Sequence, residues 1–503
     1  MSYQSYAEYY HELTKYTPTG IASNQQRLDF SNQPIPFKKY PNKKSIDLSC
    51  FLPLGSNPFS DAGIKNPKDY TKDDKSLAVL SKLLYLSNGI TAMIPYPDRP
   101  FYMRAAPSAG GLYPTEIYLC TDSYPGLEDG IYNYQIDKQS ITLINAGSFK
   151  QKVLEACFNH PAILESNLIL ILSSVFHRSS WRYQDRAYRR ICLDTGHVIG
   201  NINLVSNISG FKPTIIGGFN DRKINEILFL EEAEEQVLAV VAEGNPQSQS
   251  ESAFSNALPS RLESEDLKTP EGFRLIELHN RSRIENHVDV PNIVLNNVEE
   301  KFKFSSQILF SSKPKNFNWK ETLLPTILKR RSTRAFSGES ITQEELGSML
   351  CFTYSDELFP SYFDTSLLQT FVAVNNINGL EDGCYFYSPG GNYLRQVRFK
   401  NFRDEIYYLC LGQELGHKAS AVIFHTCDLS KAVFKYGERA YRYLHMDAGQ
   451  LGQRLNLAAI NMDLGVSGIG GFFDDQVNDL LGIPEHEAVI YITTLGVPVK
   501  SNT

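Results

Sequence analysis

The chain has 503 residues, of which 42% are hydrophobic and 21% charged, and its formal net charge is −7. This length exceeds one ordinary hydrophobic core, so we expect two or more domains. The acidic balance, without an obvious basic face, argues against a nucleic-acid-binding role. No apolar run approaches the roughly 20 residues of a membrane span, and the N-terminus lacks the basic and apolar regions of a signal peptide.

The eight cysteines are scattered along the chain, and no two of them form a Cys-x-x-Cys pair. This spacing suggests neither a zinc site nor a disulfide framework, and we expect no bound metal. A reduced, cytoplasmic protein is the simplest interpretation.

The first half opens with a helical pattern, because apolar residues recur at helical spacing from Leu77 to Leu86. Small, turn-forming residues follow between Arg104 and Pro114, and Glu116 to Leu119 is apolar enough for a buried strand. Taken alone, this pattern indicates a tight turn before a strand. Its glycines, Gly110 and Gly111, have no Cβ, so a flat ligand could lie directly on the backbone there.

An internal repeat organises the chain. The stretch Arg182-Tyr183-Gln184-Asp185-Arg186-Ala187-Tyr188-Arg189 recurs 253 residues later as Lys435-Tyr436-Gly437-Glu438-Arg439-Ala440-Tyr441-Arg442. The same offset pairs further short motifs, namely Pro107-Ser108 with Pro360-Ser361, Asp194 with Asp447, and Gly217-Gly218-Phe219 with Gly470-Gly471-Phe472. A weaker match pairs His11 with His279 near the start of each copy. We therefore predict two copies of one domain.

The predicted boundaries are domain 1 over residues 1–244, a polar linker over 245–273 and domain 2 over 274–503. The linker prediction rests on the polar residues between Asn245 and Ser252. In the second copy, Thr342 to Glu345 predicts a capping box that opens a helix. Phe371 to Val374 and Val489 to Leu495 are typical of strands. Helices and strands that mix without βαβ regularity indicate an α+β sandwich.

The second copy also contains Lys329-Arg330-Arg331-Ser332-Thr333-Arg334. Arginine forks match phosphate oxygens, and the serine hydroxyl adds a donor. A cluster of this kind, taken alone, is more often a solvated charged turn.

Together these motifs resemble the SagB-type (SagB/ThcOx) dehydrogenases, a branch of the FMN-dependent nitroreductase superfamily. Pro107 to Pro114 matches the family's PSAGGLYP signature, and Arg330-x-Ser332-x-Arg334 matches its Arg-x-Ser-x-Arg/Lys motif. The resemblance implies an FMN-dependent oxidoreductase made of tandem nitroreductase-like α+β sandwich domains that form an intramolecular pseudo-dimer. It also implies a set of FMN-binding residues, namely Pro107, Ser108, Ala109, Gly110, Gly111, Arg330, Arg331, Ser332, Arg334, Gly470 and Gly471.

Each copy keeps only one half of such a site. At the position aligned with the arginine motif, the first copy has Gly63-Ile64-Lys65-Asn66-Pro67, which contains no arginine. The second Pro-Ser loop continues as Tyr362-Phe363-Asp364, whose rings and carboxylate would exclude a flavin. We therefore predict one composite flavin site, with the phosphate clamp from copy two and the ring platform from copy one. The alternative is that both sites have decayed.

Lys435-Tyr436 matches the Lys-Tyr pair that SagB-type dehydrogenases use near the flavin. The chemistry implied is oxidation of a peptide azoline to an azole, in which hydride passes to the flavin and a base takes a proton. Lys435 and Tyr436 are the predicted catalytic residues, because Arg182 at the equivalent position of copy one stays protonated.

Two other functions stay open. One is a general NAD(P)H-dependent nitroreductase or flavin reductase that acts on small aromatics. The other is a degenerate, non-catalytic scaffold that binds a peptide or a protein partner. The expected partner is a small-molecule or peptide substrate, without nucleic acid or membrane, and association of two chains is left open.

Overall fold

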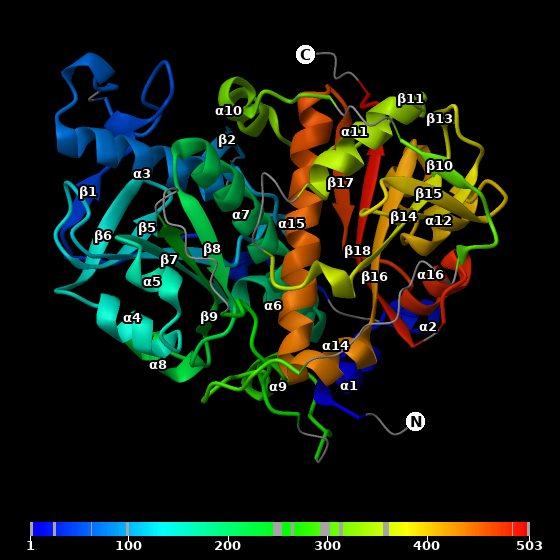
Figure 1. The fold of residues 1–503 in the computed structure, drawn as a ribbon, viewed down its shortest axis with the longest axis horizontal. Coiled ribbons are helices and arrows are strands. Elements are labelled where there is room, and N and C mark those ends of the chain that lie inside the picture. Colours follow the sequence, from blue (N-terminus) through cyan, green and yellow to red (C-terminus); the bar gives the residue numbers. More distant parts are fainter. Residues whose placement is uncertain are drawn as a thin grey trace.

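The computed structural model describes residues 4–23, 27–61, 63–96, 100–244, 254–262, 266–291, 302–310, 315–355, 362–484 and 486–499. The described chain forms two halves that meet along two long central helices (Figure 1). Each half is built around a seven-stranded sheet in which all neighbouring strands are antiparallel.

The two sheets have the same strand order. The first runs β1-β6-β5-β4-β7-β9-β8 and the second β10-β15-β14-β12-β16-β18-β17. The strands of the first sheet are β1 (Ser45–Asp47), β4 (Thr115–Thr121), β5 (Gly130–Gln135), β6 (Ser140–Ala146), β7 (Leu168–Val175), β8 (Lys212–Ile216) and β9 (Glu235–Gly244). Those of the second are β10 (Gln307–Leu309), β12 (Gln369–Val374), β14 (Gly383–Ser388), β15 (Tyr393–Arg398), β16 (Ala421–Asp428), β17 (Gly465–Ile469) and β18 (Glu487–Gly496). The predicted tandem α+β fold is confirmed.

Two short pairings lie outside these sheets. β2 (Ile90–Ile94) forms an antiparallel hairpin with β3 (Phe101–Arg104), and β11 (Ile341–Thr342) pairs in parallel with β13 (Ile377–Asn378). The hairpin leads directly into the Pro-Ser loop, where Ala109–Gly111 forms a single 3-10 turn. The first site motif therefore sits between a hairpin and the buried strand β4.

Helices cover the sheets and fill the space between them. Those of the first half are α1 (Tyr6–Leu13), α2 (Pro18–Ser23), α3 (Lys72–Asn88), α4 (Lys150–Ala156), α5 (Pro161–Leu164), α6 (Phe176–Tyr183), α7 (Ala187–Ser209) and α8 (Asp221–Ile227). Those of the second are α9 (Arg274–Arg281), α10 (Trp319–Lys329), α11 (Gln343–Thr353), α12 (Arg403–Leu409), α13 (Glu414–Lys418), α14 (Leu429–Tyr436), α15 (Ala440–Asn461) and α16 (Asp474–Leu481). No described helix combines the length and the apolar composition needed to cross a membrane.

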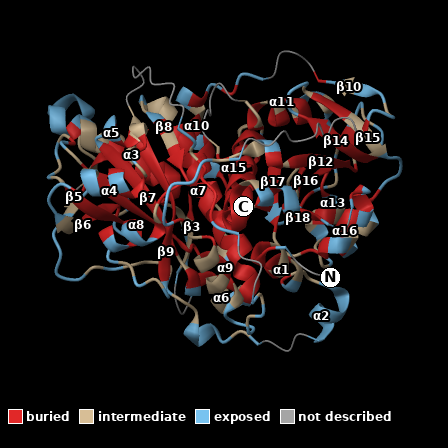
Figure 2. Ribbon diagram, turned by 60° about the horizontal axis from the view of Figure 1, so that its bottom comes forward, coloured by how far each residue is buried: buried red, intermediate tan, exposed pale blue. Residues whose placement is uncertain are grey.

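Local signals in the sequence explain where two of these helices begin. The Thr342 hydroxyl accepts from the Glu345 backbone N–H, and the Glu345 carboxylate accepts from the Thr342 N–H. This is the predicted capping box, and Thr71 with Asp74 forms the same box at the start of α3. Helices on both faces leave every residue of β4 and β12 buried, and burial continues through α7 and α15 (Figure 2).

The two halves touch most closely where α7 crosses α15. A Cβ on Gly196 would lie 2.2 Å from the backbone oxygen of Met446, and one on Gly449 would lie 2.3 Å from that of Leu193. Only glycine allows the two backbones to approach this closely. The equivalent position of these two glycines shows that the halves are related by an approximate twofold axis.

Each half also sends an arm onto the other. His11 of α1 contacts the Tyr441 hydroxyl at 3.1 Å, and His279 of α9 contacts the Tyr188 hydroxyl at 3.0 Å. Buried ion pairs repeat the same symmetry, with Asp474 bound by Arg186 (2.9 Å) and Arg189 (2.7 Å), and Asp221 bound by Arg439 (2.6 Å) and Arg442 (2.8 Å). The arms and ion pairs tie the two copies into one pseudo-dimer.

The predicted linker falls between two well-defined elements. β9 ends at Gly244 and α9 begins at Arg274. Residues 245–253 and 263–265 lie outside the described residues, and they include the polar stretch on which the linker prediction rests. The part that is described is packed against the protein, because residues 257–260 are all buried.

Candidate functional site

Arg330 carries the contact that joins the two site motifs. It follows α10 directly, and its side chain is buried with 3% of its surface exposed. Its Nε donates to the carbonyl of Ala105 at 2.8 Å, and its Nη2 donates to the carbonyl of Arg104 at 3.0 Å. Ala105 stands two residues before Pro107. The structure therefore brings the arginine motif of the second half beside the Pro-Ser loop of the first.

The arginine motif is a cluster of positive charge, and it has no counterion among the described residues. Arg331 reaches the first half as well, where its guanidinium donates to the Thr91 carbonyl at 3.2 Å. The side chains of Ser332 and Arg334 make no hydrogen bond or ion pair with any described residue. No described carboxylate forms an ion pair with any of the three arginines.

Burial lowers the pKa of Arg330 to about 10, and the nearby charges of Arg331 and Arg334 act in the same direction. The third nitrogen of its guanidinium, Nη1, is buried without a hydrogen-bond partner. Buried donors normally find acceptors, and buried charges normally find counterions. The cluster therefore has the properties of an anion site.

Backbone hydrogen bonds connect this motif to the loop at Gly470-Gly471 of the same half, called the glycine loop below. The N–H of Thr333 donates to the carbonyl of Val466 at 2.8 Å, and the N–H of Val466 donates to the Thr333 hydroxyl at 2.9 Å. Val466 lies in β17, which leads into Gly470-Gly471. Both glycines are partly exposed, and their backbone N–H groups have no acceptor within the described part of the chain. Two unpaired donors therefore stand at the end of β17.

Asp194 of α7 holds the Pro-Ser loop in place. Its carboxylate accepts from the Ser108 hydroxyl at 2.5 Å and from the Ala109 N–H at 3.2 Å. Burial raises the pKa of Asp194 to about 7. The next residue, Gly110, has φ +66° and is exposed, so the loop presents bare backbone at its surface.

Two side chains that the sequence analysis did not single out connect this loop to the glycine loop. The Tyr183 hydroxyl lies 2.9 Å from where a Cβ on Gly110 would stand. The guanidinium of Arg190 stacks 3.9 Å from the centre of the Tyr183 ring, and it donates to the Gly470 carbonyl at 2.9 Å. Tyr183 could have been found from the repeat, where it aligns with Tyr436. Arg190 could not, because the second copy has Tyr443 at that position.

The predicted catalytic pair lies at the other loop. Lys435 Nζ pairs with the Asp364 carboxylate at 2.5 Å, and the Tyr436 hydroxyl donates to it at 3.0 Å. Burial and the charge of Asp364 hold the pKa of Tyr436 well above its usual range. Within the described residues, neither side chain bonds to Pro107–Gly111 or to Arg330. Pro360 and Ser361 lie outside the described residues.

This placement follows from the fold. α6 ends beside the Pro-Ser loop of the first half, and α14 ends beside Asp364 of the second half, so each copy's pair of basic residue and tyrosine stays with its own half. Arg182-Tyr183 therefore adjoins Gly110, and Lys435-Tyr436 adjoins Asp364. The arginine motif, in contrast, crosses to the opposite half through Arg330.

Comparison with known proteins agrees with this architecture. The Nitroreductase family model matches residues 67–244 and 327–497. The chain belongs to the nitroreductase family. A crystal structure of a nitroreductase-like protein from Anabaena variabilis ATCC 29413 superposes with a TM-score of 0.90 and 47% identity, over 99% of this chain and 100% of that one.

Two curated relatives each match about a third of this nitroreductase-family chain. A nitroreductase-like protein of Methanocaldococcus jannaschii is 29% identical over 33% of this chain and 81% of its own length. The trifolitoxin-processing protein TfxB of Rhizobium leguminosarum bv. trifolii is 27% identical over 37% of this chain and 53% of its own length. The second match therefore covers about half of that protein.

Proposed function

We propose that the chain is an FMN-dependent oxidoreductase with one flavin site built from both halves. The observation that carries this proposal is the pair of hydrogen bonds from Arg330 to Arg104 and Ala105, which joins the arginine motif to the intact Pro-Ser loop. In this proposal the arginine motif holds the phosphate, and the two glycine-containing loops hold the ring. The binding residues are Arg330, Arg331, Ser332, Arg334, Pro107, Ser108, Ala109, Gly110, Gly111, Gly470 and Gly471.

The chemistry of the donors fits FMN. A phosphate dianion would give the buried Nη1 of Arg330 an acceptor and would offset the charges of Arg331 and Arg334. The exposed backbone at Gly110 leaves room for a flat ring, and the free N–H groups of Gly470 and Gly471 can donate to its polar edge. When bound, FMN supplies a carrier for hydride.

Tyr183 is the side chain best placed to handle a proton at this site. Burial raises its pKa, although Arg190 and Arg182 oppose the rise. The hydroxyl is therefore protonated at neutral pH and can donate a hydrogen bond to a substrate beside Gly110. The neighbouring Arg182 is exposed and carries a positive charge, so it favours a substrate with an anionic or negatively polarised group.

We propose two substrate classes for this oxidoreductase. The first is a peptide azoline, oxidised to the azole, which the similarity to a trifolitoxin-processing protein supports. Lys435 and Tyr436 stay the predicted base for that reaction, and they could serve only if they leave Asp364 and reach the flavin. The second class is a small electron acceptor, reduced at the expense of NAD(P)H. The proton-bearing Tyr183 and Arg182 favour this second class, because reduction needs a donor rather than a base.

The test of the flavin site is a titration of the purified chain with FMN, followed by visible absorption. We expect one FMN per chain, with binding lost in Arg334→Ala and Gly110→Trp. The matched controls are Arg222→Ala on the surface of α8 and Phe363→Trp at the equivalent position of the second loop, and both should bind normally. Two FMN per chain would contradict the composite site. A chain that binds none would be a non-catalytic scaffold.

The test of the substrate class uses the same flavin absorption without oxygen. Bleaching of the bound FMN by NAD(P)H, and its recovery with a nitroaromatic, would identify a reductase. Bleaching by a thiazoline-containing peptide, with loss of two hydrogens from the peptide in its mass spectrum, would identify an azoline dehydrogenase.

A further inference from the structure

The pseudo-dimer has a second, symmetry-related equivalent of the proposed flavin site, and part of the chain lies in it. Gly217 and Gly218 are the first-copy equivalents of Gly470 and Gly471. Their backbone N–H groups both donate to the carbonyl of Asn256, at 2.7 and 3.0 Å. In the first site the two equivalent N–H groups have no acceptor among the described residues. One pair of donors is therefore occupied by the chain itself, and the other has no partner in the described part of the chain.

The side chain two residues later is inserted beside these donors. Leu258 is 4% exposed, and a Cβ on Gly218 would lie only 2.4 Å from its Cγ. The Tyr443 hydroxyl lies 2.9 Å from the Leu258 carbonyl and 3.0 Å from the Gly217 carbonyl, and its one proton can be donated to either. Tyr443 stands where the first site has Arg190. This hydroxyl therefore bridges the inserted segment to the loop at Gly217-Gly218.

The segment is anchored beyond Leu258 as well. The N–H of Ser260 donates to the carbonyl of Tyr436 at 3.1 Å, and the Ser260 hydroxyl accepts from the N–H of Arg439 at 3.0 Å. Tyr436 is the equivalent of Tyr183, which stands beside Gly110 in the first site. The segment thus contacts Gly217-Gly218 and Tyr436, which are the second-site equivalents of Gly470-Gly471 and Tyr183.

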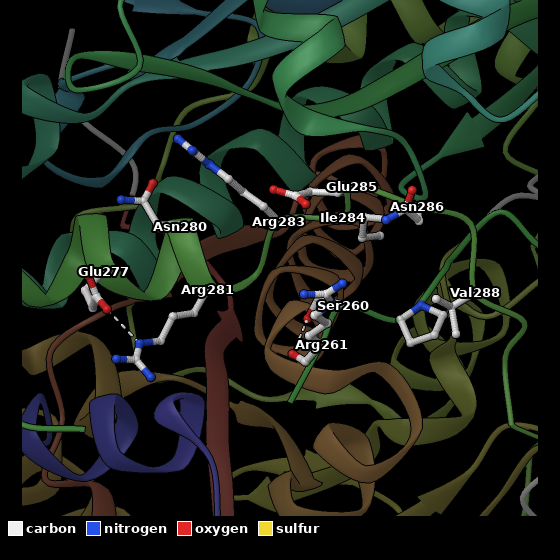
Figure 3. Close-up of a pocket in the computed structure, with 11 residues that line it drawn as sticks. Ser260, Arg261, Glu277, Asn280, Arg281, Arg283, Ile284, Glu285, Asn286 and Val288 are labelled. Atoms are coloured by element: carbon white, nitrogen blue, oxygen red, sulfur yellow. Dashed lines mark hydrogen bonds and ion pairs between the residues drawn. The ribbon is translucent and has the colours of Figure 1, made fainter. Parts of the chain in front are cut away.

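Beyond Ser260 the segment emerges at the surface. A cavity of about 370 Å³ borders it there, lined by Ser260 and Arg261 together with residues of α9 and the stretch that follows α9 (Figure 3). Arg261 is exposed and forms no ion pair with a described residue. The apolar part of the segment is therefore inserted in the second site, and its charged end faces water.

We infer that residues 254–262 are a built-in peptide ligand of the second site. They take the N–H groups that the first site keeps free, so the second site recognises an extended peptide with a backbone carbonyl at Asn256 and an apolar side chain at Leu258. The stacked rings of Phe363 and Tyr443, 4.8 Å apart, close the remaining space. The comparison with a flavin site rests on the proposed function, whereas the occupation of the second site does not.

Amide hydrogen exchange, measured by mass spectrometry on peptides that contain each glycine pair, tests this inference. In the FMN-free chain we expect Gly217-Gly218 to exchange about tenfold more slowly than Gly470-Gly471, because the N–H groups of Gly217 and Gly218 are hydrogen-bonded to Asn256. Added FMN should slow exchange at Gly470-Gly471 and leave Gly217-Gly218 unchanged. Slowing at Gly217-Gly218 would overturn the inference. Absence of any FMN effect would instead overturn the proposed function, and the comparison in the FMN-free chain would still stand.

A variant that ejects the segment gives a second test. Leu258→Asp places a carboxylate in a buried apolar position and should raise exchange at Gly217-Gly218 to the rate at Gly470-Gly471, with FMN binding retained. Leu258→Ala should give a smaller increase, and it covers the case in which the aspartate variant does not fold. The control is Leu262→Asp, at an exposed residue of the same segment, which should leave exchange unchanged. Unaltered exchange in both Leu258 variants would refute the inference.

Discussion

The Nε of Arg330 in the second half donates a hydrogen bond of 2.8 Å to the backbone carbonyl of Ala105 in the first. A second bond of 3.0 Å reaches the carbonyl of Arg104, so one planar fork spans two successive peptide groups. Both bonds hold the segment that leads into the Pro-Ser loop. In the proposed flavin site the guanidinium has two tasks, which are to position this loop and to offer its third nitrogen to the phosphate.

The substitution Arg330→Lys tests whether Arg330 acts through its hydrogen bonds or only through its positive charge. Lysine keeps the positive charge but cannot form the two-pronged bond, and a hydrogen bond to a charged group is worth about 1.5–3 kcal/mol. We expect FMN to bind about 10- to 100-fold more weakly, measured by fluorescence titration, and the melting temperature to fall. Arg222→Lys on the surface of α8 is the control. Unchanged affinity with a lowered melting temperature would mean that Arg330 only joins the halves.

The buried carboxyl of Asp194 should make stability fall as pH rises. Its pKa is raised from 3.8 to about 7, so between these values the folded chain binds a proton that the unfolded chain has lost. The stabilisation is fully present below the unfolded pKa and is lost as pH rises toward 7, by at most about 4 kcal/mol. Asp194→Asn can still accept from Ser108, and it should remove this part of the pH dependence. Urea unfolding of both proteins at pH 4 to 8 would show this as a difference in the slope of unfolding free energy against pH.

Much of the fold could be predicted because the signals are local or periodic. The repeat of Arg182–Arg189 at Lys435–Arg442 identified two copies of one domain, and the two sheets have the same strand order. The capping box at Thr342 and Glu345 lies where the sequence placed it. The meeting of Arg330 with the Pro-Ser loop could be anticipated only because each copy matches a different one of the family's two motifs.

Other features depend on which parts of the two copies meet in space, and the sequence holds no local sign of this. The repeat alone could not show that Lys435-Tyr436 stays with Asp364 while the arginine motif crosses to the first half. The linker prediction rested on residues 245–252, which lie outside the described residues, and it held no sign that Leu258, further along, is buried against Gly218. Its backbone N–H and carbonyl both have the Tyr443 hydroxyl of α15 as a partner, 185 residues away in sequence.

The crossing of α7 and α15 should not tolerate a larger residue. In Gly196→Ala the new methyl group would overlap the Met446 carbonyl, 2.2 Å away, and neither backbone can move without shifting a long buried helix. Overpacking of this kind costs about 1–3 kcal/mol or more, so we expect a lower melting temperature and weaker FMN binding. Gly55→Ala is the control, because that glycine is exposed and a Cβ there would meet no atom within 4 Å. Equal melting temperatures for the two variants would contradict the close crossing.

Tyr183 and Tyr436 occupy equivalent positions, and the matched pair Tyr183→Phe and Tyr436→Phe asks which of the two acts at the flavin. Tyr183 stands over Gly110, whereas the Tyr436 hydroxyl is engaged by Asp364 at 3.0 Å. General acid or base catalysis contributes about 10²–10⁴-fold, so Tyr183→Phe should lower turnover by about that range with FMN binding retained. Tyr436→Phe should leave turnover within about twofold and reduce thermal stability, since it removes a hydrogen bond to a charged group. The reverse result, measured with whichever substrate bleaches the flavin, would place the reaction at the second loop and restore Lys435 and Tyr436 as the catalytic pair.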